Sequence, residues 1–218
     1  MKKLLIALAV LIFIAGAFFW CAFYRVVPQP AWISATPRDR YFYGSVAPGK
    51  AEGIPYWVWL ALPRMFPEYM PAPGGYAALG LSWEEGKEMP VGFAKQRIGF
   101  IRVTGNCALC HAVSGPPAMP RGVPTVISSI PGRTTDLEPL LTFYRKCAAD
   151  PRFTADDIFG QVDQATRLSV FDRMLYRCIL IPRARKMLRD PATVLFSPEI
   201  LAHIRDPKGV VPPVPLVR

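Results

Sequence analysis

Three residues whose chemistry suits a cofactor stand together at positions 106–111, in the run Asn-Cys-Ala-Leu-Cys-His. Two thiols three positions apart on one helical turn can each bond to a vinyl group of one haem, and the adjacent imidazole can then ligate the iron. Cys-x-x-Cys-His is the attachment signature of c-type haem, in which histidine is the usual proximal ligand. We therefore predict one covalently attached haem c, bound through Cys107 and Cys110, with His111 as the iron ligand.

Two other uses of a cysteine pair fit this sequence less well. A structural zinc site needs four ligands, and the only other histidine is His203, with no second Cys-x-x-Cys pair in the chain. A thioredoxin-like redox pair is expected after a strand, in a βαβ setting that this sequence does not indicate.

The second axial ligand of the iron stays open at this point. The candidates are an unoccupied position or one of four side chains: Met119, Met174, Met187 and His203. Met174 lies 63 residues after His111, a separation common in small cytochromes c, whereas Met119 lies in a proline-rich loop. An open site and a methionine ligand fit equally well, and His203 fits less well than either.

The residues around the motif add two expectations. Gly99 and Val103 precede Cys107 at intervals of four, where small monohaem cytochromes c carry a glycine and then an aromatic residue. Val103 stands in the place of the aromatic residue and departs from that pattern, which counts against a standard small cytochrome c fold. Three arginines flank the segment: Arg102, Arg121 and Arg133. One of them is a candidate to pair with a haem propionate, although solvation at the surface is the more common role for any single arginine. Of the remaining cysteines, Cys21 lies in the apolar N-terminal run, and Cys147 and Cys178 are expected to form a disulfide or to stay as buried thiols.

A longer stretch resembles a known family. Residues 89–112, together with 147–154 and 180–182, look like the first haem region of the rubber-oxygenase-like di-haem cytochromes, which are relatives of the di-haem cytochrome c peroxidases. The resemblance covers about residues 75–190 and implies haem attachment at the same three residues, with an open distal position. Family members carry a second Cys-x-x-Cys-His, and this chain has one, so the oxygenase or peroxidase activity of that family is not carried over.

The N-terminus has the pattern of a membrane anchor. Lys2 and Lys3 precede residues 4–23, which carry no charge and are long enough, at roughly 30 Å, to cross a bilayer core. A cleavable signal peptide is the alternative, but its apolar core is shorter and ends at small residues. We predict an uncleaved single-pass anchor in the bacterial inner membrane, with the lysines in the cytoplasm and the haem domain in the periplasm.

Composition limits the remaining possibilities. The 218 residues include 24 prolines, about twice the usual share, which favours short helices joined by long loops. The net charge of +10 suits an acidic redox partner protein, a membrane complex or anionic lipid, and equally suits simple solubility. No interleaving of aromatic and basic residues indicates a nucleic acid partner.

The chain divides into an anchor (1–25), an extended linker with one short docking helix at 55–66 (26–88) and a haem domain (89–218). Residues 24–52 and 113–133 are predicted to be irregular, and no alternating pattern predicts a sheet. A capping box at Thr135 and Glu138 starts a helix, Thr154 caps a second helix, and a third runs over 169–188 with a bend at Pro182. A short last helix is expected from the Ser-Pro pair at 197–198.

Further detail concerns the faces of these helices. The first is expected to bury Leu137, Leu140, Leu141, Tyr144 and Cys147. The second is expected to bury Ile158, Val162 and Ala165, and the third Phe171, Leu175, Cys178 and Ile179. The fold class is therefore mainly α: an N-terminal transmembrane helix plus a loop-rich, cytochrome c-like helical haem domain.

These expectations favour electron transfer by a membrane-anchored monohaem c-type cytochrome, alone or as a subunit of a respiratory or photosynthetic complex. A haem enzyme or gas sensor with an open distal site is the alternative, and a haem-bearing structural accessory subunit is the third.

Overall fold

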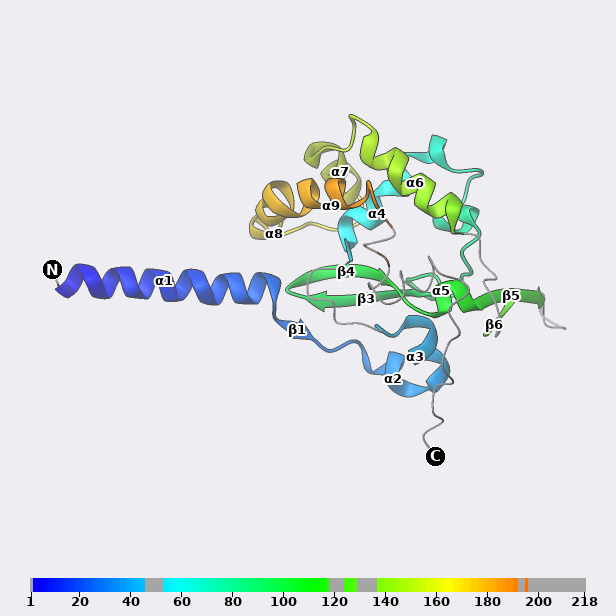
Figure 1. The fold of residues 1–218 in the computed structure, drawn as a ribbon, viewed down its shortest axis with the longest axis horizontal. Coiled ribbons are helices and arrows are strands. Elements are labelled where there is room, and N and C mark those ends of the chain that lie inside the picture. Colours follow the sequence, from blue (N-terminus) through cyan, green and yellow to red (C-terminus); the bar gives the residue numbers. More distant parts are fainter. Residues whose placement is uncertain (1, 46–52, 118–123, 129–136, 192–194, 196–218) are drawn as a thin grey trace, which may run out of the picture.

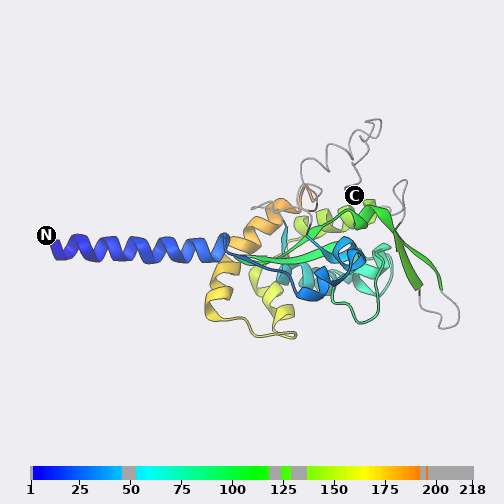
Figure 2. The same cartoon turned by 90° about the horizontal axis from the view of Figure 1, so that it is seen from below.

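A long helix leads into a domain in which helices lie on both sides of a small antiparallel sheet (Figures 1 and 2). The computed structural model describes residues 2–45, 53–117, 124–128, 137–191 and 195. The described residues are mainly helical, which confirms the predicted class at that level.

The N-terminal helix, α1 (Lys2–Phe23), projects from one end of the domain (Figure 1). Its 19 residues Leu5–Phe23 are long and apolar enough to cross a membrane, and almost none of that stretch is buried by the domain. The chain leaves α1 through Tyr24 and Arg25, whose amide groups both donate to the Trp20 carbonyl and close the helix.

The sheet has four strands in the order β1-β3-β4-β2, and every neighbouring pair is antiparallel. The strands are β1 (Val26–Val27), β2 (Ile54–Pro55), β3 (Phe93–Ile98) and β4 (Phe100–Gly105). The prediction that the chain forms no sheet is therefore wrong. In β3, Phe93 and Ala94 are both buried, and in β4 Arg102 and Val103 are both buried, because helices cover the two faces of the hairpin. Strict alternation is thus lost, and the two-residue strands are too short to give a signal.

Glycines fix the β3–β4 hairpin at both ends. At the tip, Gly99 donates from its amide to the Arg25 carbonyl at 2.7 Å, and an added Cβ would lie 2.0 Å from the Ala22 carbonyl oxygen. At the base, an added Cβ on Gly92 would lie 2.3 Å from the Leu109 Cα. Six residues of strand lie between the two contacts, a span of roughly 20 Å. The hairpin therefore holds the end of α1 and the helix α5 (Ala108–His111) at a set separation.

The helices above the sheet share one aromatic core with it. Trp59 and Tyr76 stack with ring centroids 4.3 Å apart, and Phe143 and Tyr144 pack against the Tyr76 ring. The elements that contribute are α4 (Tyr56–Met65), η1 (Pro67–Tyr69), η2 (Gly75–Leu79), α6 (Glu138–Ala149) and α7 (Ala155–Val162). The helix predicted at 55–66 is confirmed as α4. Much of segment 26–88, treated above as a linker with a docking helix, is thus buried in the same core as α6 and α7.

Several predicted details are confirmed. The Thr154 hydroxyl accepts from the Asp157 amide and caps α7, as predicted. The third helix begins near Ser169 as predicted, and the Ser169 hydroxyl accepts from the Asp172 amide and caps it, a contact that the sequence analysis did not name. Leu140, Tyr144, Cys147, Ile158 and Val162 are buried as expected, and Leu137 and Leu141 are half-buried. Ala165 lies beyond α7 and is exposed, so that prediction is wrong. Thr135 of the proposed capping box and the Ser-Pro pair at 197–198 lie outside the described residues.

The third predicted helix is present but turned the other way. It consists of α8 (Val170–Leu175), a π-helical turn η3 (Tyr176–Leu180) and α9 (Ile181–Met187). Pro182 is the second residue of α9, so the π-helical turn ends two residues before the proline. Leu175 is buried, whereas Phe171, Cys178 and Ile179 of the predicted inner face are exposed. The periodicity is helical as predicted, but the assigned face is wrong because most of it is directed away from the core.

Two segments predicted to be irregular contain regular structure. Residues 24–52 include β1 and the short helices α2 (Ala31–Ala35) and α3 (Pro37–Tyr43), the second of which is capped by the Thr36 hydroxyl. Residues 113–133 include a second hairpin formed by β5 (Ala112–Pro117) and β6 (Pro124–Ser128). The prolines of the second hairpin lie at its irregular end, where Pro117 and Pro124 face each other, which hid the strands.

The base of the β3–β4 hairpin supplies a test of this packing. Gly92 and Gly80 both have positive φ, +89° and +83°, so an alanine costs about 1–2 kcal/mol at either position. Only at Gly92 does an added Cβ meet backbone; at Gly80 nothing lies within 4 Å. We expect Gly92→Ala to lower the free energy of unfolding by an additional ~1–3 kcal/mol relative to Gly80→Ala. Urea unfolding in detergent, followed by circular dichroism, measures the difference, and equal losses would contradict the close approach.

Candidate functional site

The predicted cofactor residues lie on a single helical turn. The amides of Cys110 and His111 both donate to the Cys107 carbonyl, at 3.3 and 3.1 Å, so the three side chains leave one turn of backbone. Cys107 is exposed, Cys110 is buried and His111 is half-buried. The structure therefore brings together all three residues, with the spacing that attachment of one haem requires.

Asn106 anchors this turn and was missed by the sequence analysis. It is buried, and its Nδ2 donates to the Phe42 and Gly44 carbonyls, at 3.1 and 3.0 Å, at the end of α3. Its Oδ1 accepts from the Ala108 amide at 2.9 Å, and its own amide donates to the Gly92 carbonyl at 2.8 Å. The sequence could have indicated this role, because an asparagine just before a short helix commonly accepts a hydrogen bond from the backbone amide two residues later.

The surroundings of His111 bear on its predicted role as an iron ligand. The Nδ1 atom of His111 is buried and has no hydrogen-bond partner among the described residues. Tyr41 lies close enough to both thiols for them to affect it: burial raises the pKa of Tyr41, and Cys107 and then Cys110 raise it further. Two sulfur atoms and one imidazole on one turn are the donor set of a c-type haem, so the residues present fit that group.

The competing uses of the cysteine pair find less support in the described residues. No three histidine, cysteine, aspartate or glutamate side chains cluster there as metal ligands, so a zinc site lacks its ligand set within those ranges. Strand β4 does precede the motif, which the sequence analysis did not expect. The sheet is antiparallel, however, and α5 leads into the β5–β6 hairpin, which differs from the βαβ setting of thioredoxin-like pairs.

The distal ligand candidates are separated by their place in the fold. Met174 is 61% exposed on α8, beside the end of α1, where the Phe18 and Phe171 rings meet at 4.5 Å. Helix α5 lies toward the opposite end of the β3–β4 hairpin (Figure 1), so Met174 does not face His111. Met187 is partly buried against the core, whereas Met119 and His203 lie outside the described residues.

Two further predictions are corrected. Arg102 does not flank α5: it lines a cavity with Phe19 and Phe23 of α1, because it is near the start of β4, at the end of the hairpin that contacts α1. Arg121 and Arg133 lie outside the described residues. The predicted disulfide is not formed, since Cys147 is a buried free thiol in α6 and Cys178 is an exposed free thiol in η3. Burial raises the pKa of the Cys147 thiol, which makes that side chain unreactive core packing.

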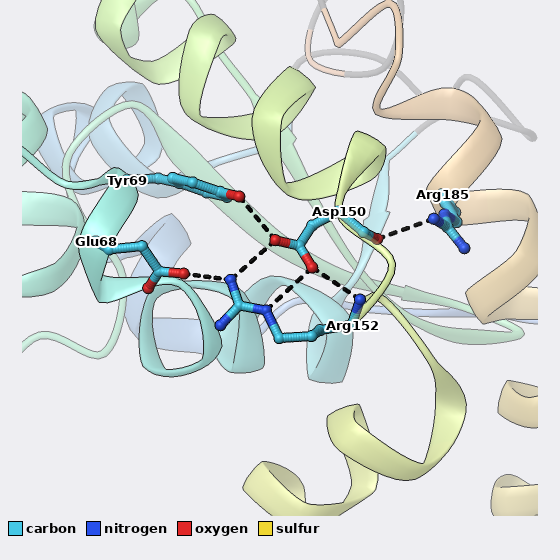
Figure 3. Close-up of polar contacts among 5 residues, drawn as sticks. All are labelled: Glu68, Tyr69, Asp150, Arg152 and Arg185. Atoms are coloured by element: carbon cyan, nitrogen blue, oxygen red, sulfur yellow. Dashed lines mark hydrogen bonds and ion pairs between the residues drawn. The ribbon is translucent and has the colours of Figure 1, made fainter.

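A second polar cluster, outside α5, connects three elements of the domain (Figure 3). The Asp150 carboxylate accepts from the Tyr69 hydroxyl at 2.7 Å and from the Arg152 guanidinium at 2.8 and 3.1 Å. Arg152 also pairs with Glu68, and Arg185 donates to the Asp150 carbonyl at 2.9 Å. The cluster thus ties η1 and the end of α6 to α9, a structural role, and the sequence analysis did not identify it.

Comparisons of the chain with protein-family models, with curated proteins and with solved structures gave no match. The assignment of function therefore depends on the residues of α5 and on what surrounds them.

The Asp150 cluster predicts a specific dependence of stability on pH. The Arg152 guanidinium and then the Tyr69 hydroxyl hold the pKa of Asp150 well below its usual range. A carboxylate with a lowered pKa in the folded state stabilises the protein above its unfolded pKa of about 3.9, and that stabilisation is lost as the pH falls toward the folded value. We expect Asp150→Asn to lower the melting temperature at pH 7, with a smaller difference from wild type at pH 3.

Asp156→Asn is the matched control, because Asp156 pairs with Arg177 on the exposed surface. Such a pair contributes little to stability, so this variant should melt close to wild type at both pH values. Melting curves of the three proteins by circular dichroism decide the matter. A difference between Asp150→Asn and wild type that stays constant from pH 7 to pH 3 would contradict the assigned role.

Proposed function

We propose that this protein is a membrane-anchored monohaem c-type cytochrome that exchanges electrons with a redox partner protein or a membrane complex. Cys107 and Cys110 would hold the haem covalently, and His111 would ligate its iron. When bound, the group supplies reversible one-electron chemistry. The observation that carries the proposal is the placement of these three side chains on one helical turn.

The chain's own residues would orient such a group and set its distance from the membrane. The β3–β4 hairpin separates α5 from the end of α1 by roughly 20 Å, so a cofactor on α5 would stand clear of a membrane crossed by α1. Asn106 and Gly92 fix α5 to the end of α3 and to the hairpin base. The exposure of Cys107 leaves that edge of the turn accessible to a partner.

We propose that the haem domain lies on the periplasmic side of a bacterial inner membrane, because the two lysines at the start of α1 favour the cytoplasmic side. We also propose that the domain is cytochrome c-like. The resemblance of residues 89–112 to the first haem region of the rubber-oxygenase-like cytochromes supports this. Oxygenase or peroxidase turnover is not proposed, because the chain has one Cys-x-x-Cys-His motif.

Covalent attachment is tested by haem staining after denaturing electrophoresis of protein from cells competent in haem attachment. Wild type should stain at its own mass, and the Cys107→Ala, Cys110→Ala double variant should not. The single variants should stain weakly, since each keeps one thioether. Cys178→Ala, which removes an exposed free thiol at a distance from the motif, should stain like wild type. A colourless wild-type band would refute the proposal.

Visible spectra separate the electron carrier from the alternative enzyme or gas sensor. Electron transfer is favoured when both axial positions are filled, because little rearranges as the iron changes charge. We therefore expect a six-coordinate, low-spin haem whose ferrous spectrum is unchanged by carbon monoxide. Met119, Met187 and His203 are then replaced one at a time, and only one of these variants should have an open distal position. Met174→Leu is the control and should change nothing, since Met174 is exposed on α8, whose Phe171 contacts α1 at the end of the domain away from α5.

Stoichiometric carbon monoxide binding by the wild type would contradict the expected coordination and favour the enzyme or sensor.

A further inference from the structure

A cavity of about 360 Å³ lies where α1 meets the domain. Its walls come from three elements that are far apart in the sequence: the end of α1, strand β4 and the helix formed by η3 and α9. Apolar and aromatic side chains make up most of the lining: Phe19, Phe23, Tyr24, Phe100, Ile179 and Leu180. The two charged residues that line it, Arg102 and Arg183, are both cations.

Arg102 is held firmly in this cavity. It is 2% exposed, its guanidinium lies 4.2 Å from the Phe100 ring centroid, and one of its amino groups donates to the Ile98 carbonyl at 2.7 Å. Burial, and to a smaller extent the nearby charge of Arg183, lower the pKa of Arg102 to about 10. Arg102 and Arg183 thus place two guanidinium groups on the wall of one largely apolar cavity, an arrangement that suits a bound anion such as a phosphate.

The surface beside the cavity is unusually apolar. Four side chains of α8 and η3 are exposed, with Val170 exposed by 85%: Val170, Phe171, Met174 and Ile179. These four residues lie on α8 and the π-helical turn that follows it, and we call them the outer face of this helix. Exposed apolar patches rimmed by charged residues mark sites of interaction with proteins or membranes.

The position of the outer face relative to α1 indicates which of the two it meets. The Phe171 ring packs edge-on against the Phe18 ring of α1. Phe18 lies five residues before the end of α1, or roughly 7.5 Å along its axis. Interfacial helices bury their apolar face about 5–10 Å into the headgroup and acyl boundary. A bilayer crossed by α1 would therefore reach the outer face and the mouth of the cavity, and both figures place α8 at the end of the domain nearest to α1 (Figures 1 and 2).

We propose that this cavity binds an anionic phospholipid, whose headgroup phosphate contacts Arg102 and Arg183 and whose acyl chains lie along the aromatic side chains of α1. Guanidinium groups suit phosphate oxygens, and the apolar walls suit the chains. An acidic group, Asp172, lines the adjoining cavity, where its carboxylate accepts a hydrogen bond from the Ser169 hydroxyl at the start of α8. The inference rests on the membrane insertion of α1 within the proposed function, but not on the haem.

The test is a lipid titration of the full-length protein, delipidated in a zwitterionic detergent, with bound lipid counted by native mass spectrometry. Phosphatidylglycerol should bind more tightly than phosphatidylcholine. Arg183→Gln should weaken phosphatidylglycerol binding about five-fold. Arg183 is chosen because it is exposed, so its removal leaves the core intact.

Arg189→Gln is the matched control, since it removes the same charge close by, from a different cavity. It should bind phosphatidylglycerol like wild type. Equal binding of the two lipids, or equal weakening in both variants, would overturn the inference. Displacement of phosphatidylglycerol by equimolar inorganic phosphate would also overturn it, because a site for free phosphate gains nothing from the apolar walls.

Two measurements separate this result from a failure of the proposed function. Resistance of the protein to alkaline extraction from membranes tests the insertion of α1, and haem staining tests the cofactor. A protein that passes both tests without preferring phosphatidylglycerol refutes the lipid site alone.

Discussion

Close contacts at two glycines determine where the candidate cofactor site lies. Gly99 lies against the last turn of α1, and Gly92 lies against the backbone of α5, each at a distance that no side chain would permit. The paired strands between them form an antiparallel ladder from Phe93↔Gly105 to Ile98↔Phe100, which resists bending because its backbone groups are paired with one another. The apolar helix α1 and the turn that carries the candidate haem residues are thus joined by one stiff element, and the proposed distance of the cofactor from the membrane follows from the length of that element.

The polar contacts around α5 serve the same arrangement. The Asn106 side chain donates to the Phe42 and Gly44 carbonyls and accepts from the Ala108 amide. A buried amide with several partners defines one orientation, because leaving any of these groups unpaired away from water costs about 1–3 kcal/mol. Asn106 touches no candidate haem ligand with its side chain, yet it sets the direction in which Cys107, Cys110 and His111 leave the backbone.

The opposite end of the domain has a different chemistry. There the helix α8–η3 turns apolar side chains outward next to α1, and Arg102 lies buried among aromatic rings. In water alone this would be a poor arrangement, since exposed apolar area and a buried cation both reduce stability. If α1 crosses a bilayer, as proposed, lipid would cover the exposed apolar side chains, and an anionic headgroup would compensate the buried cation. Under that proposal this end of the domain would face lipid, and α5 would lie toward the other end.

Local patterns in the sequence were sufficient for features that depend on neighbouring residues. The helical turn of the Cys-x-x-Cys-His motif, the apolar length of α1, the helix at Tyr56–Met65, the cap at Thr154 and the start of a helix near Ser169 all follow from spacing within a few residues. The tertiary structure alone decided the sheet, the outward face of α8, the partners of Asn106 and the place of Arg102. Each of these depends on contacts between segments separated by tens of residues, and no periodicity within a segment records which neighbour will cover it.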